Sequence, residues 1–316
     1  MERINLIKNQ LSSSSSSDPL NRIWVTKSMV PHNFEQKGTL KGKTLFITGA
    51  SRGIGLAIAL RAARDGANIA IAAKTVTEQK KLEGTIYSAA EKIRKCGGNA
   101  LPIQCDIRSE ESVKKAVELT VKTFGGIDIL INNASAINLS STEELDVKRY
   151  DLMQGVNARG TFVCCKICLP YLKQAANPHI LTISPDVKEI TNNYWFKNHA
   201  GYSIAKFGMS LCTMGLAEEF RMKEYNVAVN SLWPKTTIAT AATNNLLGGD
   251  VLLKISRKPE IMADAAYVIL TSDSKKTTGN FFYDDEVLLS NGVEDLSEYN
   301  YDKNTPMKDL AQDFFI

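Results

Sequence analysis

Residues 44–55 read Thr-Leu-Phe-Ile-Thr-Gly-Ala-Ser-Arg-Gly-Ile-Gly, and the rest of the chain can be organised around them. The first five residues are apolar or β-branched, which is typical of a short buried strand. A glycine-rich turn follows at once, and a helical pattern begins inside it and runs to residue 65. A strand, a glycine-rich turn and a helix in this order are the first half of a βαβ unit, which predicts a parallel sheet.

From residue 43 to residue 284, short apolar runs alternate with longer amphipathic stretches, as in a chain of βαβ units. The short runs are apolar on both faces, which strands covered by helices on both sides require. The sequence therefore predicts an α/β fold of the Rossmann type, a doubly wound parallel sheet of about seven strands with helices on both faces. We expect strands at residues 44–48, 68–73, 100–105, 127–132, 179–184, 227–232 and 280–284, and helices near residues 54–65, 85–96, 110–124, 147–172, 202–225 and 261–270.

The chain divides into three parts. Residues 1–38 show no sustained period and contain a serine tract at residues 12–17 followed by Asp18-Pro19, so we predict a disordered extension. Its excess of cations resembles a mitochondrial presequence, although two acidic residues argue against one, and both interpretations stay open. Residues 39–290 are predicted to form the Rossmann domain, and residues 291–316 a polar tail that becomes apolar at its end.

The composition excludes several classes of protein. The formal net charge of +4 is small and scattered, so we expect neither a nucleic-acid partner nor a charged membrane surface as partner. No apolar run approaches the roughly 18 to 20 residues that span a bilayer, so we expect no transmembrane segment. The six cysteines fall in apolar stretches, which indicates a reduced compartment. Cys165 and Cys168 form a C-x-x-C without a second pair, so we predict core packing there and no metal site.

The glycines of residues 49–55 have the order of a dinucleotide-binding turn. Gly49 permits a sharp exit from the strand, Gly53 lets the backbone approach a phosphate, and Gly55 lets the helix pack closely on the sheet. The amino terminus of the helix offers free N–H groups and a positive dipole end to a pyrophosphate. We therefore predict cofactor contacts from Gly49, Ser51, Arg52, Gly53, Ile54 and Gly55.

The end of the second predicted strand indicates which dinucleotide binds. An acidic residue there would bind the ribose hydroxyls of NAD, but the chain reads Ala72-Ala73-Lys74-Thr75. Arg52 and Lys74 are two cations suited to the 2′-phosphate of NADP, so we expect NADP(H) to be preferred over NAD(H). The alternative is that both are solvated surface charges. Asp106, after the third strand, is placed either to contact the adenine edge or to cap the next helix.

Tyr202 and Lys206 are four residues apart, so a helix places both side chains on one face. A free tyrosine has a pKa near 10, and a fixed cation beside it lowers that pKa. The positive charge of an oxidised nicotinamide would lower it further. Tyr202 is therefore predicted to be a proton donor or acceptor that works near neutral pH.

These motifs together resemble the short-chain dehydrogenase/reductase family, over about residues 40–284. Asn132-Asn133-Ala134 is similar to the family's signature after the fourth strand, and it implies that Asn133 helps to bind the cofactor. The family has a catalytic tetrad, and the positions that match it are Asn157, Ser184, Tyr202 and Lys206.

The resemblance implies a role for each residue of this tetrad. Ser184 would hydrogen-bond the substrate oxygen while Tyr202 transfers the proton. Lys206 would orient the ribose and tune Tyr202, so both belong to the predicted cofactor site as well. Asn157 would hold a water molecule in the proton relay. The structural alternatives are a strand-end cap at Ser184 and a buried helix residue at Asn157.

Several shorter strings are similar to one branch of the family, which typically continues into a sterol carrier protein domain. They lie at residues 73–75, 84–87, 183–185, 195–197 and 232–236. That branch implies a link to lipid metabolism and a location in the peroxisome or mitochondrion, with the cytoplasm left open. The family commonly forms dimers or tetramers through its long helices, which implies a homo-oligomer here.

Three departures from the family pattern border the predicted catalytic site. Ser135 and Lys235 stand where the family usually has glycine. The gap from Ser184 to Tyr202 is longer than usual, and Pro185 follows the serine directly. We therefore keep two hypotheses, an active oxidoreductase and a catalytically weak cofactor-binding regulator or scaffold in lipid metabolism.

The substrate side of the site is predicted to be apolar. An aromatic loop with Tyr194, Trp195 and Phe196 precedes the catalytic tyrosine, and residues 238–251 form a lid with two leucines and a Gly-Gly hinge. These features favour a hydrophobic, lipid-derived alcohol or carbonyl substrate, although aromatic residues also pack simply against a lid. The leading hypothesis is hydride transfer between NADP(H) and such a substrate. His199 is interpreted as structural, because the tetrad already supplies an acid–base group.

Overall fold

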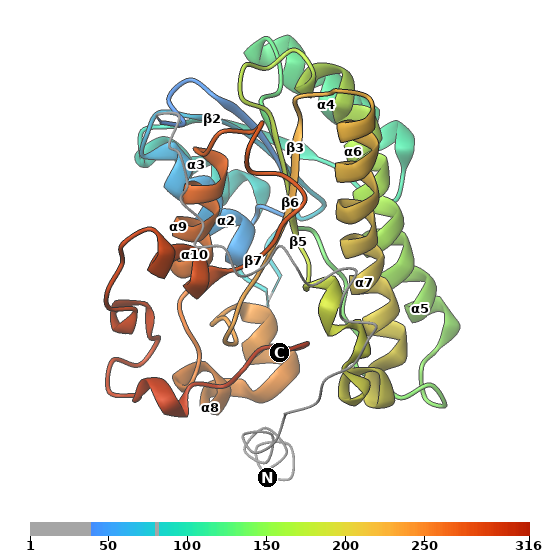
Figure 1. Cartoon of the computed structure of the whole chain (residues 1–316), viewed down its shortest axis with the longest axis vertical. Coiled ribbons are helices and arrows are strands. Elements are labelled where there is room, and N and C mark those ends of the chain that lie inside the picture. The colour runs from blue at the N-terminus through green and yellow to red at the C-terminus, as the bar shows by residue number, and fades with distance from the viewer. Residues whose placement is uncertain (1–38, 80–81) are drawn as a thin grey trace.

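The computed structural model describes residues 39–79 and 82–316. The predicted extension over residues 1–38 lies outside them, together with its presequence-like pattern. The described residues form a seven-stranded sheet in the order β3-β2-β1-β4-β5-β6-β7, in which all pairs are parallel (Figure 1). The strands are β1 (Thr44–Thr48), β2 (Asn68–Ala73), β3 (Asn99–Gln104), β4 (Ile129–Asn132), β5 (His179–Ile183), β6 (Ala228–Trp233) and β7 (Phe281–Tyr283).

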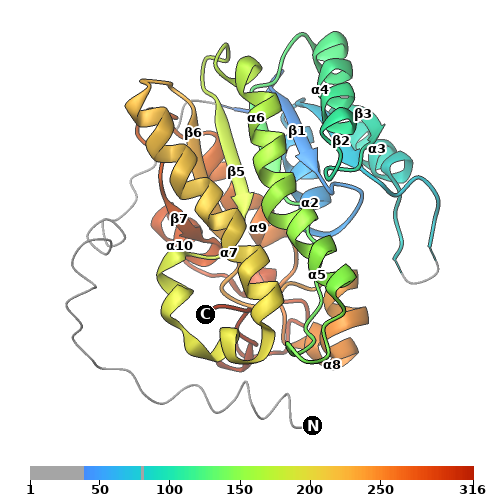
Figure 2. The same cartoon turned by 90° about the vertical axis from the view of Figure 1, so that its right-hand side faces the viewer.

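Helices cover both faces of this sheet, and α4, α6 and α7 lie in front of it in Figure 2. Leu45 and Ile47 of β1 pack into one hydrophobic cluster with α2, α3 and α9, whereas Phe46 packs into a second cluster with α4 and α6. This alternation follows from the two-residue period of a strand. The predicted doubly wound fold is therefore confirmed. The helices named here are α2 (Gly53–Ala63), α3 (Ile86–Lys95), α4 (Glu110–Phe124), α6 (Gly160–Leu172), α7 (Asn193–Met222) and α9 (Glu260–Leu270).

The strand order reverses at β1, which pairs with β2 on one side and with β4 on the other. Connections on either side of such a reversal leave toward opposite faces of the sheet. They open a crevice outside the carboxyl ends of the two central strands. Thr48 ends β1 and Asn132 ends β4, so the glycine-rich turn begins at this crevice.

The helix predicted over residues 147–172 is interrupted. It consists of α5 (Val147–Gln154), a π-helical turn η2 (Gly155–Arg159) and α6. A π turn contains one extra residue and rotates the side chains within it, which the regular helical period does not reveal. Asn157 lies in this turn.

The helix predicted to begin at residue 202 starts nearer to β5, at Asn193 in α7. The Asn192 side chain accepts a hydrogen bond from the Tyr194 backbone N–H and caps the first turn. A kink at His199, where φ is −140° and ψ is 47°, separates this early part from the rest of α7. The interpretation of Tyr194, Trp195 and Phe196 as a loop is therefore wrong, because the capped start makes the segment helical.

The predicted lid also contains helical structure. It includes the π-helical turn η4 (Thr243–Gly248) and the short helix α8 (Gly249–Lys254). Gly249 has a φ of +61°, a conformation that side-chain-bearing residues rarely adopt. The turn between η4 and α8 therefore depends on glycine at this position.

Residues 291–316, predicted as a tail, return to the sheet domain after the short helix α10 (Asp284–Ser290). Leu296, Tyr299 and Phe315 are buried in the same hydrophobic cluster as α2 and α9. In Figure 1 the end of the chain lies beneath β7, near the lower end of α7. This segment therefore contributes to the core of the Rossmann domain.

One buried histidine makes the stability of the fold depend on pH. His179, at the start of β5, is fully buried, and its Nε2 hydrogen-bonds the Ser272 carbonyl oxygen at 3.1 Å. Burial lowers the pKa of His179 to about 4. The unfolded chain therefore binds one more proton than the folded chain between pH 6.5 and pH 4, so stability falls as the pH falls through this range. The full effect is about 3 kcal/mol, since one pKa unit is worth about 1.4 kcal/mol.

We expect His179→Gln to flatten this part of the pH profile, because glutamine keeps an N–H donor for Ser272 but does not titrate. Urea unfolding of both proteins between pH 4.5 and pH 7 measures the two slopes. Equal slopes would show that His179 does not carry the dependence.

Candidate active site

The glycine-rich turn holds two glycines in the left-handed region, Gly49 with a φ of +68° and Gly53 with a φ of +58°. A Cβ atom on Gly49 would lie 2.9 Å from Ala134 Cα. A Cβ atom on Gly55 would overlap the side-chain amide of Asn133. The turn therefore has no room for side chains against the residues that follow β4.

Asn133 ties the carboxyl ends of β1 and β4 together. Its Nδ2 donates to the carbonyl oxygens of Thr48 at 2.9 Å and of Gly49 at 3.2 Å. In return, the Thr48 hydroxyl accepts hydrogen bonds from the backbone N–H groups of Asn133 and Ala134. The structure thus brings the predicted residues Gly49, Gly55 and Asn133 into one rigid unit.

This unit fits a dinucleotide. Arg52 is the N-cap of α2, and its side chain makes no capping hydrogen bond to the first turn. The backbone N–H groups of Gly53, Ile54 and Gly55 therefore lack a side-chain cap, and they lie beside the buried Ser51 at the amino terminus of the helix. A helix terminus without its own cap is suited to a phosphate anion.

The cations predicted to select NADP lie around this turn. The Arg52 guanidinium donates to the carbonyl oxygens of Glu83 at 2.9 Å and Leu82 at 3.0 Å, and it also bonds Gly84. Arg52 therefore clamps the segment that precedes α3 onto the glycine-rich turn. Lys74 follows β2, and its side chain is more than half exposed. Its Nζ lies 3.9 Å from Asp106 Oδ2.

Asp106 is held by a residue that the sequence analysis did not single out. Arg108 binds the Asp106 carboxylate with Nε at 3.0 and 3.1 Å and with Nη2 at 2.5 Å. These hydrogen bonds are the main cause that lowers the pKa of Asp106. Lys74, Arg108 and Asp106 together carry one net positive charge after the carboxyl ends of β2 and β3.

Helix α7 carries Lys206 to the carboxyl end of the neighbouring strands. Its Nζ donates to the Ile183 carbonyl oxygen, the last of β5, at 2.7 Å, and it lies 4.8 Å from the centre of the Trp233 ring at the end of β6. Lys206 is only 2% exposed. Burial lowers the pKa of Lys206 to about 7, so its charge changes near neutral pH.

Tyr202 lies one turn earlier on α7, and only 6% of it is exposed. Burial raises the pKa of Tyr202 above its ordinary value, and the nearby Asp313 carboxylate raises it further. This direction is opposite to the lowering that the sequence predicts from Lys206 and an oxidised nicotinamide, and burial of the phenol is its main cause.

Asn157 is fully buried in the π-helical turn η2. Its Oδ1 accepts from the Ala136 N–H at 2.8 Å, and its Nδ2 donates to the Ala136 carbonyl oxygen at 3.0 Å. The side chain therefore fixes the chain that leaves β4 beside Asn133. The predicted role in holding a water molecule stays a prediction.

Ser184 makes a buried hydrogen bond to the neighbouring strand, and its predicted role toward the substrate oxygen stays a prediction. The Ser184 hydroxyl lies 2.7 Å from the Ser231 hydroxyl on β6, and Ser231 in turn donates to Thr213 on α7 at 3.0 Å. All three residues are buried. Ser184 thus belongs to a chain of hydroxyl groups that runs from β5 through β6 to α7.

Two aromatic residues near the end of the chain, Phe314 and Phe315, contact Tyr202, although the sequence did not assign them to the site. The Phe315 ring stacks on the Tyr202 ring with centres 5.9 Å apart and an angle of 25°, and Phe314 approaches its edge at 6.0 Å. Trp195 packs on Phe314 at 4.7 Å. In the sequence, Phe314 and Phe315 appear only as the apolar end of an otherwise polar tail. That pattern does not show that they pack against Tyr202.

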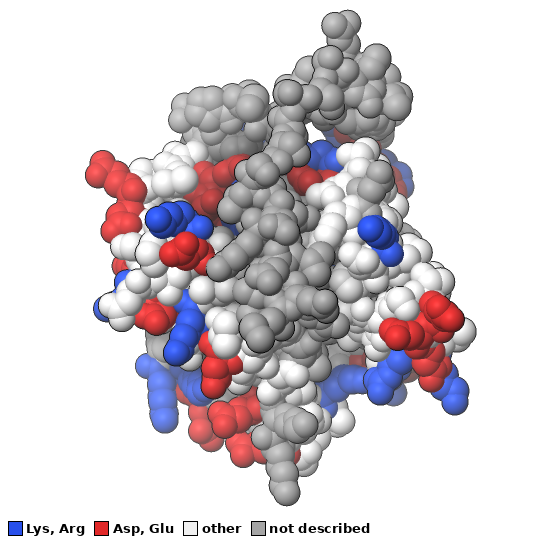
Figure 3. Space-filling model, turned by 90° about the horizontal axis from the view of Figure 1, so that it is seen from below, with Lys and Arg blue, Asp and Glu red and all other residues white. Residues whose placement is uncertain are grey.

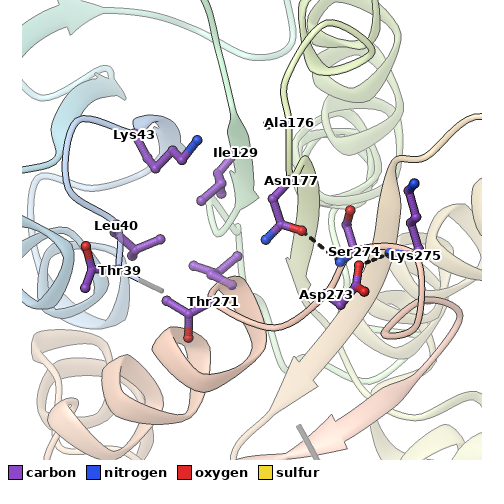
Figure 4. A pocket seen from close by; sticks show the side chains of 11 residues that line it. Thr39, Leu40, Lys43, Ile129, Ala176, Asn177, Thr271, Asp273, Ser274 and Lys275 are labelled. Atoms are coloured by element: carbon purple, nitrogen blue, oxygen red, sulfur yellow. Dashed lines mark hydrogen bonds between the residues drawn. The ribbon is translucent and has the colours of Figure 1, made fainter. Parts of the chain in front are cut away.

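The hollow in Figure 4 belongs to a different part of the molecule. It measures about 410 Å³, and its lining includes Lys43, Ile129 and Asn177, which lie at the amino ends of β1, β4 and β5. Asn177 Oδ1 accepts from the Ser274 N–H there. The glycine-rich turn and Lys206 lie at the carboxyl ends of the same strands, so this hollow is not part of the candidate site.

Metal and thiol chemistry find no support in the described residues. Residues 39–79 and 82–316 contain no group of three or more His, Cys, Asp or Glu side chains arranged to hold a metal ion. Burial raises the pKa values of Cys165 and Cys168, so their thiols are protonated and poor ligands at neutral pH. Within the same described ranges, no helix combines the length and apolar character that crossing a membrane requires.

Residues 43–248 match the short chain dehydrogenase family. The chain belongs to this family. Hydroxysteroid dehydrogenase-like protein 2 from Xenopus laevis is 54% identical over 279 residues, which are 88% of this chain and 64% of that protein. The human protein of the same name is 52% identical over 279 residues, which again are 88% of this chain and 64% of that protein. The present chain thus spans less than two thirds of the length of these relatives.

Two solved structures are similar over almost their whole length. A dehydrogenase from Xanthomonas campestris has 56% identity and a TM-score of 0.83, covering 88% of this chain and 99% of its own. A short chain dehydrogenase from Mycobacterium thermoresistibile has 51% identity and a TM-score of 0.81, covering 88% and 96%. The predicted family is confirmed, and members of the short-chain dehydrogenase/reductase family are oxidoreductases that use NAD(P)(H).

Proposed function

We propose that this chain transfers a hydride between NADP(H) and a hydrophobic, lipid-derived alcohol or carbonyl compound. The observation that carries the proposal is the convergence of two groups at one edge of the sheet. Lys206 and Tyr202 of α7 lie at the carboxyl ends of β5 and β6, and the glycine-rich turn lies at the carboxyl end of β1. Cofactor and acid–base groups then meet at the edge where ligands bind in doubly wound sheets.

The chemistry that these residues support is the reduction of a carbonyl and its reverse. A bound NADPH supplies the hydride. In the reductive direction the carbonyl carbon gains this hydride, and its oxygen gains the proton of the Tyr202 hydroxyl, which yields the alcohol. The Lys206 ammonium, where it is protonated, stabilises the phenolate left on Tyr202 until a solvent proton restores it.

The preference for NADP(H) rests on the cations around the glycine-rich turn. Lys74 and Arg108 leave a net positive charge at the end of β2 and β3, and Arg52 anchors the neighbouring segment. The two residues directly after β2 are Lys74 and Thr75, so no acidic side chain stands there to repel a 2′-phosphate. We assign Arg52 and Lys74 to that phosphate and Asp106 to the adenine side.

Arg52→Ala is expected to weaken NADPH binding at least tenfold more than NADH binding, because a charge-assisted hydrogen bond is worth about 1.5–3 kcal/mol. The loss of the Arg52 clamp on residues 82–84 affects both cofactors alike and cancels in the ratio. Quenching of tryptophan fluorescence measures both affinities, and Arg64→Ala at the far end of α2 is the charge-matched control. Equal weakening of both cofactors would remove Arg52 from the phosphate site.

The substrate class rests on the aromatic surroundings of Tyr202. Trp195, Phe314 and Phe315 are apolar neighbours that would favour an apolar substrate over a sugar or an acid. The name of the relatives, hydroxysteroid dehydrogenase-like protein 2, also favours a lipid-derived substrate. We therefore propose a role in lipid metabolism. For the location we propose the peroxisome or mitochondrion, with the cytoplasm as the alternative.

We further propose a homo-oligomer. Phe162 on α6 and Ile204 and Leu211 on α7 are each about half exposed on the outer helices, which is unusual for large apolar side chains. On the described part of the face seen in Figure 3, Lys and Arg side chains are interspersed with Asp and Glu side chains, which agrees with a partner that is not a nucleic acid. Sedimentation equilibrium measures the assembly directly.

The test is NADPH oxidation by the purified chain over a panel of ketones and acyl carbonyls. Turnover that depends on Tyr202 would establish the function and begin to identify the substrate. The second hypothesis is a catalytically weak cofactor-binding regulator, and the bond of Ser184 to Ser231 favours it because one predicted catalytic hydroxyl is engaged elsewhere. Tight NADPH binding without Tyr202-dependent turnover would support that hypothesis instead.

A further inference from the structure

We propose that residues 311–316 are part of the catalytic site and that Phe315 is its positioning residue, which holds the Tyr202 ring in the orientation that proton transfer needs. The proposal rests on the proposed oxidoreductase function and deepens it. It assigns a catalytic task to a segment that lies beyond the residues 43–248 matched by the family.

Phe315 occupies the centre of an aromatic cluster around Tyr202. It is 1% exposed. Besides the stacked Tyr202 ring, it packs on Phe207, with ring centres 5.2 Å apart, and on Trp233, with ring centres 5.9 Å apart. Phe207 follows Lys206 directly on α7, and Trp233 is the ring over Lys206 Nζ. Phe315 therefore contacts the Tyr202 ring directly, and it also contacts the Trp233 ring against which Lys206 Nζ lies.

Hydrogen bonds fix the segment to the loop after β6. The Trp233 indole N–H donates to the Phe314 carbonyl oxygen at 2.7 Å. The Asp313 N–H donates to the Lys235 carbonyl oxygen at 3.2 Å, and the Thr237 N–H donates to the Ala311 carbonyl oxygen at 2.9 Å. These bonds join the segment to the end of β6 and to the loop after it, so hydrophobic contact alone does not determine where Phe315 lies.

The backbone of Phe315 has a φ of +65°, which is uncommon for a residue with a large side chain. Such a conformation persists only where the surroundings impose it, and it is concentrated at functional sites. Here it directs the Phe315 ring inward to Tyr202.

The position of the Tyr202 hydroxyl is sensitive to its ring. Tyr202 has no hydrogen bond to a described residue that would aim its hydroxyl, so packing against the ring must do so. A misplacement of about 1 Å can lower a rate by about a hundredfold. Phe315 supplies the stacked face of that packing.

The first experiment is a double-mutant cycle on the full chain, with a carbonyl substrate from the panel. Phe315→Ala is expected to lower kcat about tenfold to a hundredfold, by the same positional sensitivity, with little change in NADPH affinity. In the Tyr202→Phe background, Phe315→Ala should lower the residual rate no further, because the group that it positions is absent. Phe315→Leu should recover most of the rate, since leucine refills most of the space.

Phe220→Ala is the matched control. Phe220 is also 1% exposed and lies near the other end of α7, next to Tyr225. It should destabilise the fold to a similar extent without a loss of kcat in the folded protein. Equal losses of kcat in both variants, or additive losses with Tyr202→Phe, would overturn the proposal.

A second measurement does not need turnover. Tetranitromethane nitrates tyrosines, and mass spectrometry compares Tyr202 with the exposed Tyr87 in the same sample. Phe315→Ala should speed the nitration of Tyr202 relative to Tyr87 several-fold, whereas Phe220→Ala should leave the ratio unchanged. If no carbonyl is reduced but Phe315→Ala raises the Tyr202-to-Tyr87 nitration ratio, the proposed function is refuted and the contact of Phe315 with Tyr202 is supported. If turnover is found but neither kcat nor the ratio changes, the function stands and the role of Phe315 is refuted.

Discussion

Tyr202→Phe is expected to lower turnover by about 10²–10⁴-fold, the range that general acid–base catalysis contributes. The substitution removes one hydroxyl and keeps the ring, so the stacking on Phe315 and the edge contact with Phe314 remain. NADPH affinity should change by less than about threefold, because little binding area is lost. Steady-state rates of NADPH oxidation and fluorescence titration with NADPH measure the two quantities.

A matched control for this substitution is Tyr225→Phe, three residues after the end of α7, where the ring packs on Phe220 near the other end of the helix. It should leave turnover at the level of the parent protein. Full turnover in Tyr202→Phe would assign proton transfer to another group and would contradict the proposed chemistry. An equal loss of NADPH affinity and turnover would show that Tyr202 acts through cofactor binding.

Gly55→Ala is expected to weaken NADPH binding by at least about a hundredfold, because its methyl group would occupy the position of the Asn133 amide. Asn133 cannot move away freely, since the same Nδ2 bonds the carbonyl oxygens of Thr48 and Gly49. The added methyl group therefore opens the joint between β1 and β4 where the glycine-rich turn starts. Fluorescence titration measures the affinity, and thermal unfolding separates local damage from loss of the fold.

Two other glycines make this prediction specific. Around Gly215, within α7, a Cβ atom would meet nothing within 4 Å, so Gly215→Ala should leave affinity unchanged and stabilise the helix by about 0.5–1 kcal/mol. A Cβ atom on Gly53 would lie 3.6 Å from Thr240, and its cost comes from the backbone conformation, about 1–2 kcal/mol. An affinity of Gly55→Ala equal to that of Gly215→Ala would refute the proposed cofactor turn.

The strands were predictable because their apolar runs are short and separated by helical periods. Predicted and observed strands agree at residues 44–48 and 68–73, and the other strands begin or end within a few residues of the predicted bounds. The helices agree less well where a local event interrupts the period. The π-helical turn that contains Asn157 and the start of α7, capped by Asn192, are local interruptions that the hydrophobic period does not record.

The candidate site divides in a similar way. Gly49, Gly55 and Asn133 meet as the motif predicts, because residues at the carboxyl ends of adjacent parallel strands must lie close together. Ser184 was placed in the site by its motif alone, but the direction of its hydroxyl depends on Ser231, which arrives from another strand. A motif specifies a residue type at a strand end and does not specify its rotamer.

Residue order and hydrophobic period were sufficient to predict the doubly wound sheet, the cofactor turn and the Tyr-Lys pair, because each follows from a local pattern or motif. The burial of Tyr202, the Arg108 fork on Asp106 and the return of Phe315 to α7 required the folded chain. They join residues that are held together only by packing and hydrogen bonds across the molecule, and a polar tail of irregular sequence carries no period from which such contacts can be inferred.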